Sequence, residues 1–233
     1  MSVSGKMNRQ PFNYLIFLLL TPLTIYIGLT FFEDRSYIFI SFVIVILALL
    51  PFLMSFESKE ANTRYMVIIA VLVAMSVVGR FLFAAIPAFK PVTAIVVISA
   101  MFFGAEAGFL VGALSAIISN IYFGQGPWTP FQMFSWGMIG FIAGLPKVRQ
   151  LLKTNRFMLV LYGIFAGIIY SLMMDIWTVL SLDNMFNLKR YLTAISIATP
   201  FMITYAVSNV IFLLLIIKPI GEKLDRIKLK YGI

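Results

Sequence analysis

Residues 157–181 read FMLVLYGIFAGIIYSLMMDIWTVLS and carry a single charged side chain, that of Asp175. At a rise of about 1.5 Å per residue, a helix of this length is roughly 37 Å long. That length exceeds the hydrocarbon core of a bilayer, which is about 30 Å thick. The polar and apolar alternation of a membrane β-strand is not seen in this stretch. The segment therefore predicts a transmembrane helix with one acid inside it.

Similar apolar stretches run along the rest of the chain, separated by short joints that are polar or contain Gly and Pro. They cover residues 12–32, 37–56, 65–86, 92–105, 108–123, 130–146 and 191–217. Because unpaired backbone groups are costly in lipid, each stretch is expected to be helical. The stretches at 92–105, 108–123 and 130–146 are short for a full crossing, which favours tilted or partial spans there. We predict an all-α, polytopic membrane protein with about eight transmembrane helices and no soluble domain.

The composition supports this class and excludes several functions. The chain is 61% hydrophobic and 12% charged, whereas a soluble domain is about 25% charged. His and Cys are both absent, which removes disulfides, thiol chemistry, imidazole catalysis and most zinc sites. The net charge of +9 is attributed to cytoplasmic loops rather than to nucleic-acid binding. We expect no enzymatic activity, no cofactor and no metal.

The distribution of basic residues predicts the topology. With eight spans, thirteen of the eighteen Lys and Arg residues fall on one side and four on the other, while Arg80 lies within a span. The positive-inside rule then places both termini in the cytoplasm. The most polar internal joint, residues 57–64, divides the chain into a two-helix N-terminal segment, residues 1–61, and a six-helix unit, residues 62–233.

Several polar or amphipathic residues fall in the outer third of the predicted spans: Arg80, Asn120, Gln132, Trp136, Asp175 and Trp177. An ionisable side chain at such depth is costly unless it is paired or lines a wet cavity, so Arg80 and Asp175 are candidates for a functional site. Two interpretations stay open. The two residues can pair with each other and hold helices together, or they can contact a ligand. The two amides can likewise serve helix packing or ligand binding.

The outer joint at residues 122–132, YFGQGPWTPFQ, is dense in polar and aromatic residues. Its Gly and Pro residues allow a tight, non-helical shape. Gln125, Trp128 and Thr129 supply an amide, a flat ring and a hydroxyl, so this loop can close over a flat organic ligand. The alternative is an ordinary turn with an interfacial aromatic belt.

Small residues recur at four-residue spacing in three places: Ala70 and Ala74, Gly108 and Gly112, and Gly140 and Gly144. Such pairs let two helices approach closely. Each pair can serve packing within the chain or docking of a partner.

From about residue 62 the chain resembles the S components of energy-coupling factor (ECF) vitamin transporters. The matching segments are AVLVA at 70–74, GAEAGFLVGALS at 104–115, and NIYFGQGPWTPFQM at 120–133 leading to WGMIG at 136–140. The similarity covers roughly 150 residues. S components usually have six helices, so the two-helix N-terminal segment is a departure from the family.

The resemblance implies a protein of the bacterial plasma membrane that captures a vitamin from outside and performs no chemistry itself. It implies delivery by toppling against a module made of a transmembrane coupling protein and two cytoplasmic ATPases. In the family, an Ala-x-x-x-Ala face meets the coupling protein, which corresponds to Ala70 and Ala74 here. Ligand contacts in the family come from outer loops and outer helix halves. The expected contact set is Arg80, Asn120, Gln125, Trp128, Thr129, Gln132, Trp136 and Asp175.

The loop variant GQGPWTP at 124–130 is most similar to S components assigned to cobalamin, which is our best candidate substrate. Because there is no His to coordinate the cobalt, the corrin amides and the nucleotide loop would hold such a ligand. A queuosine precursor or another flat heterocycle is the alternative. Two other functional classes are a stand-alone transporter coupled to protons through Asp175 and a membrane enzyme acting on lipid. The first should show internal repetition and the second a metal cluster or an activated nucleophile, and the sequence carries neither.

Overall fold

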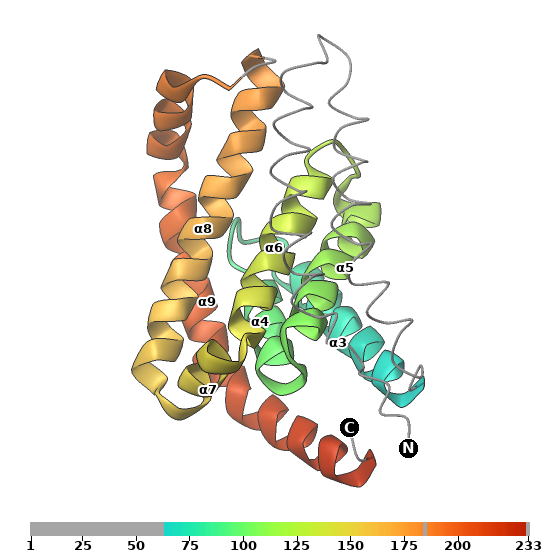
Figure 1. The fold of residues 1–233 in the computed structure, drawn as a ribbon. Helices are drawn as coiled ribbons and strands as arrows, with labels where there is room; N and C mark the ends of the chain where they lie inside the picture. Colours follow the sequence, from blue (N-terminus) through green and yellow to red (C-terminus); the bar gives the residue numbers. More distant parts are fainter. Residues whose placement is uncertain (1–62, 184–185, 232–233) are drawn as a thin grey trace, which may run out of the picture. The chain divides into compact units, whose positions relative to one another are not determined.

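The computed structural model describes residues 63–183 and 186–231, which all belong to one compact unit, Asn62–Ile233. This part of the chain consists of seven α-helices without a strand (Figure 1). The helices are α3 (Thr63–Leu82), α4 (Val92–Phe103), α5 (Ala105–Phe123), α6 (Thr129–Gly144), α7 (Pro146–Thr154), α8 (Arg156–Asp183) and α9 (Leu188–Tyr231). The predicted spans at 12–32 and 37–56 lie outside the described residues. The total of eight helices and the boundary after residue 61 therefore stay predictions.

The six apolar stretches predicted after residue 62 each correspond to a helix. Among the described residues, α3, α5, α8 and α9 are long and apolar enough to cross a membrane, and α4 is a shorter apolar helix. The all-helical membrane architecture predicted for this unit is thereby confirmed.

Helix α4 forms the centre of the unit. All of its residues from Val92 to Phe102 are buried, and it packs against α3, α5, α6 and α9. A helix that is apolar on every side needs neighbours on every side. Helix α4 is therefore enclosed by other helices along its length.

Glycines bring α5 and α6 close together. A Cβ atom added at Gly108 would lie 2.5 Å from the carbonyl oxygen of Gly140, and one added at Gly112 would lie 2.5 Å from that of Trp136. No side chain fits at those distances, so the two backbones are in direct contact. The Gly108/Gly112 and Gly140/Gly144 pairs therefore serve packing within the chain.

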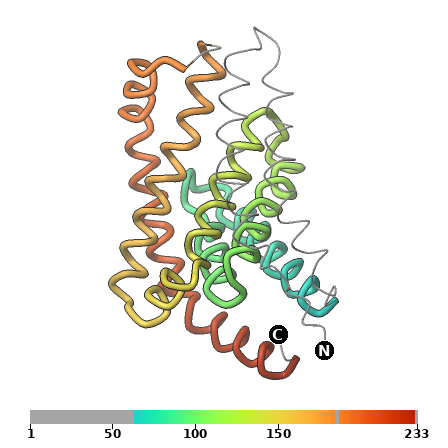
Figure 2. The backbone as a smooth tube through the Cα atoms, in the orientation of Figure 1, coloured from blue at the N-terminus to red at the C-terminus, as the bar shows by residue number. Residues whose placement is uncertain are grey.

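Two elements differ from the prediction. The joint at 147–156, for which no helix was predicted, contains α7, which begins at Pro146 and buries Leu152. Proline is favourable at the first helical position, where no backbone donor is needed. Helix α9 continues past the predicted end at 217 to Tyr231, with Pro219 inside it. Its last part turns away from the preceding part of α9 (Figures 1 and 2), as expected where proline removes a helix hydrogen bond.

Candidate functional site

Arg80 lies in the last turn of α3 and binds two neutral side chains of α5. Its Nη1 donates to Oδ1 of Asn120 at 2.8 Å and to Oγ of Ser119. The guanidinium carbon also lies 4.5 Å from the ring centroid of Phe123. Ser119 and Asn120 are both buried. The cation is thus held at the end of α3 by neutral dipoles and a ring face.

A chain of amide hydrogen bonds extends from this point across the bundle. Asn120 Nδ2 donates to Oε1 of Gln132 on α6 at 2.8 Å. Gln132 Nε2 in turn donates to the hydroxyl of Tyr170 on α8 at 2.9 Å. All three side chains are buried. Three helices that are separate in sequence are therefore joined through one polar layer, and each member of it fixes the orientation of the next.

Aromatic rings form the wall beside this polar layer. The Trp136 indole and the Tyr170 ring are stacked, with centroids 5.2 Å apart and planes 11° from parallel. Tyr205 of α9 meets Tyr170 edge-on at 4.8 Å. Trp136 is among the largest fully buried side chains. A stacked pair of this kind is a surface on which a flat ring can pack.

The loop between α5 and α6 is closed by its own hydrogen bonds. Thr129 Oγ1 donates to Oε1 of Gln125 at 3.0 Å, and Gln125 Nε2 donates to the carbonyl of Ile117 at 2.7 Å. Asn120 Nδ2 reaches Thr129 Oγ1 at 3.0 Å, which connects the loop to the amide chain. The Trp128 ring covers Gly126 and stays 37% exposed. Gln125 and Thr129 thus join the polar cluster, whereas Trp128 lies at its outer edge.

Asp175 does not pair with Arg80. Its side chain on α8 is buried, and Oδ2 has no hydrogen-bond partner in the described part of the chain. The salt bridge recorded within residues 63–183 and 186–231 joins Arg190 and Asp183. The interpretation in which Arg80 and Asp175 hold helices together as an ion pair is therefore wrong. The reason is that α3 presents Arg80 to α5 rather than to α8.

Lys90 is the main feature of the site that the sequence did not reveal. It ends the loop after α3, and its backbone N–H donates to Oγ of Ser208 on α9 at 2.9 Å, while that hydroxyl donates back to the Lys90 carbonyl at 3.1 Å. This anchor brings Nζ to 5.6 Å from the Trp136 centroid and 5.1 Å from that of Tyr205. Burial, with a smaller effect from Arg80, lowers the pKa of Lys90 to about 7.

Tyr170 and Tyr205 were missed as well, because each lies in the middle of a long apolar helix where tyrosine is unremarkable. A usable signal for Lys90 existed in its position. It directly precedes Pro91, which lies at the start of the buried helix α4, and the sequence on both sides of it is apolar. A lysine in such a position is not expected to be fully exposed to solvent.

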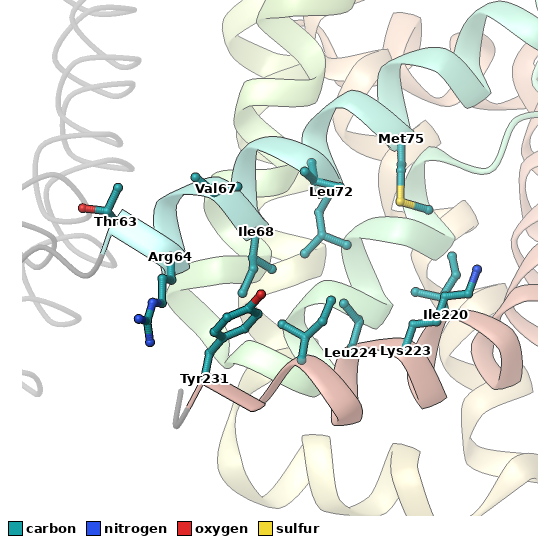
Figure 3. A pocket seen from close by; sticks show the side chains of 12 residues that line it. Thr63, Arg64, Val67, Ile68, Leu72, Met75, Ile220, Lys223, Leu224 and Tyr231 are labelled. Atoms are coloured by element: carbon teal, nitrogen blue, oxygen red, sulfur yellow. The ribbon is translucent and has the colours of Figure 1, made fainter. Parts of the chain in front are cut away.

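The opposite end of α3 borders a groove. It lies between the first part of α3 and the last part of α9 (Figure 3) and has a volume of about 640 Å³. Its apolar lining consists of Val67, Ile68, Val71, Leu72, Met75, Ile220, Leu224 and Ile227. Ala70 and Ala74 are exposed and do not line this groove. The two alanines therefore form a separate strip on the surface of α3.

No group of three or more His, Cys, Asp or Glu side chains within the described residues is arranged to hold a metal ion. The site consists instead of amides, hydroxyls, aromatic rings and two cations. Such donors and acceptors bind and orient an organic ligand.

The helices and this cluster define a membrane protein with a buried polar and aromatic layer between its helices. A family model described as ECF-type riboflavin transporter, S component, matches residues 60–225. The chain belongs to this family. It is thus a substrate-binding subunit of an ECF transporter for a vitamin-like small molecule, working with the ECF module, and its family is one of transport subunits rather than of enzymes. No curated protein matches the chain, and no solved structure does.

Proposed function

We propose that this S component captures a flat heterocyclic vitamin of the riboflavin type at the site built around Asn120, Gln132 and Trp136. The observation that carries the proposal is the meeting of the Asn120–Gln132–Tyr170 amide chain with the Trp136–Tyr170 stack. A heterocycle such as a flavin has ring carbonyls and N–H groups along its edge, and side-chain amides both donate and accept. Its flat faces match the indole and phenol rings.

Cobalamin remains the second candidate, supported by the GQGPWTP loop. It is much larger than a flavin, and Asn120, Gln132, Trp136 and Tyr170 are buried in contact with one another. A corrin ring would have to separate most of these contacts. A flavin needs only to stack on the Trp136–Tyr170 pair or to take the place of one of its two rings. The riboflavin-type ligand is therefore favoured, in keeping with the description of the matching family.

Further contacts in the proposal come from residues around the central cluster. Arg80 offers a fork of donors to ligand oxygens, and Gln125, Trp128 and Thr129 close the outer edge. Asp175 has an unpaired, buried oxygen, which is costly unless a donor reaches it. The hydroxyl groups of a polyol side chain would provide such a donor.

Delivery in this proposal uses the inner half of α3. The exposed strip formed by Ala70 and Ala74 docks the transmembrane coupling protein, and two cytoplasmic ATPases drive the cycle. The protein lies in the plasma membrane of a bacterium with both termini in the cytoplasm. In the same proposal, residues 1–61 add two helices to the unit Asn62–Ile233.

Binding is tested on the purified full chain in detergent, by titration with riboflavin and, separately, with cobalamin. Saturable quenching of flavin fluorescence at one ligand per chain is the expected result. Tight binding of cobalamin with no response to riboflavin would replace the proposed substrate. Trp128→Ala should weaken riboflavin binding without loss of expression, and Leu182→Ala, an exposed residue on α8, is the matched control.

Transport is tested in proteoliposomes that contain the chain with or without the ECF module. Uptake of labelled riboflavin should require both the module and ATP. The ATP has to be on the side of the membrane on which the ATPases lie. Uptake driven by a proton gradient without the module would contradict the proposal and favour a secondary transporter coupled through Asp175.

A further inference from the structure

Two cations approach the same indole ring in the binding site. The Arg80 guanidinium carbon lies 5.4 Å from the Trp136 centroid, and Lys90 Nζ lies 5.6 Å from it. They reach it from different elements, Arg80 from the end of α3 and Lys90 from the loop before α4. Two positive charges thus converge on the wall against which the proposed heterocycle packs.

Among the residues that the structure describes, neither cation has an acidic partner. Arg80 binds Asn120 and Ser119, which are neutral, and Lys90 Nζ meets only the ring faces of Trp136 and Tyr205. Within the described ranges the recorded salt bridge lies elsewhere, between Arg190 and Asp183. The buried acid Asp175 leaves Oδ2 unpaired rather than reaching either cation.

This arrangement is unfavourable in the protein alone. Like charges repel more strongly in a low-dielectric environment than in water, and a cation removed from water is costly until an anion or donor-rich partner compensates it. The lowered pKa of Lys90 reflects the same imbalance. A ligand that carries negative charge removes both penalties at once.

We propose that Arg80 and Lys90 form an anion subsite beside Trp136, so that the preferred ligand is a heterocycle bearing an acidic group such as a phosphate or carboxylate. Arg80 provides a planar fork for two anion oxygens, and Lys90 provides a point charge. The loop that carries Lys90 is fixed to α9 through Ser208, so the charge is positioned before the ligand arrives. This inference rests on the proposed function, because it assigns charge to the ligand of that same site.

The test compares a neutral and an anionic ligand with the same ring system, riboflavin and riboflavin 5′-phosphate, on the full chain in detergent. The wild-type protein should bind the phosphate ester at least about tenfold more tightly than riboflavin, a preference that corresponds to one charge-assisted contact. Lys90→Met should reduce the ratio of the two affinities to near one, and Lys90→Arg should retain most of it. Lys189→Met, which removes an exposed lysine from the first turn of α9, should leave the ratio unchanged.

The outcomes separate this inference from the proposed function. If riboflavin binds and the phosphate ester binds equally or less tightly, the anion subsite is refuted while the flavin site stands. If neither flavin binds, the proposed function itself fails. If the ester is preferred and Lys90→Met keeps the full preference, Lys90 does not form the subsite. A thermal unfolding curve for each variant shows that the altered ratio does not come from misfolded protein.

Discussion

Asn120 on α5 donates a hydrogen bond from Nδ2 to Oε1 of Gln132 on α6 at 2.8 Å, and both side chains are buried. Arg80 of α3 donates to Asn120, and Gln132 donates to the hydroxyl of Tyr170 on α8. The bond between the two amides therefore joins Arg80 and Tyr170 into one network. The amide pair therefore links the four helices that form the proposed site.

Replacing Gln132 by Leu should weaken both the site and the fold. The substitution leaves Asn120 Nδ2 without one acceptor and the Tyr170 hydroxyl without a donor, at a cost of about 1–3 kcal/mol in unfolding free energy. Riboflavin affinity should fall by at least about tenfold. Both are measured on detergent-purified protein, by thermal unfolding and by fluorescence titration.

Ser135→Ala is the matched control for Gln132→Leu. Ser135 is also buried on α6, but its hydroxyl donates to the Phe131 carbonyl of its own helix at 2.6 Å. It should change riboflavin affinity little. Equal losses of affinity in the two variants would show that the amide chain has no special role.

Gly108→Ala should disrupt the contact between α5 and α6. The new Cβ would lie 2.5 Å from a backbone oxygen of Gly140, and backbone cannot rotate away as a side chain can. Overpacking of this kind costs about 1–3 kcal/mol. Gly163→Ala is the control, since its nearest neighbour is the flexible end of Leu213 at 3.1 Å. The prediction fails if both variants unfold at the same temperature.

Ala70→Trp or Ala74→Trp should reduce co-purification with the ECF module and leave riboflavin binding near the wild-type value. Both alanines are exposed on α3 and precede Arg80, which lies in the last turn of that helix. Leu161→Trp, at an exposed position in the first half of α8, tests whether a bulky residue on another exposed helix face has the same effect. Unaltered co-purification in both alanine variants would assign these residues to lipid or to packing.

The affinity for riboflavin 5′-phosphate should fall as the pH rises from about 7 to about 8.5. The pKa of Lys90 is lowered to about 7, so its positive charge is present below that pH and is lost above it. The other titratable groups around this position are Arg80 of α3 and Tyr205 of α9, with Tyr170 and Asp175 of α8 close to Tyr205. Arginine and tyrosine ordinarily titrate at or above about pH 10, aspartate near about pH 4 and the phosphate ester near about pH 6, which all lie outside this interval.

Lys90→Arg provides the check on this pH dependence. Arginine keeps its charge throughout the interval, so the fall in affinity should disappear in that variant. A fall of the same size in Lys90→Arg would assign the titration to another group.

The hydrophobic pattern of the sequence was enough to determine the six apolar helices of the described unit, because the length of an apolar run fixes whether it can cross a bilayer. It did not reveal α7 or the continuation of α9 to Tyr231, since these segments are polar. It also placed Arg80, Asn120, Gln132 and Trp136 at a common depth, since depth follows from the position along a span. The partners of these residues depended on the rotation of each helix about its axis and on the path of the loops. Only the tertiary structure showed that Arg80 turns to Asn120 rather than to Asp175, and that Lys90 folds back onto Trp136 and Tyr205. Those contacts are made between elements far apart in the chain, so no local periodicity encodes them.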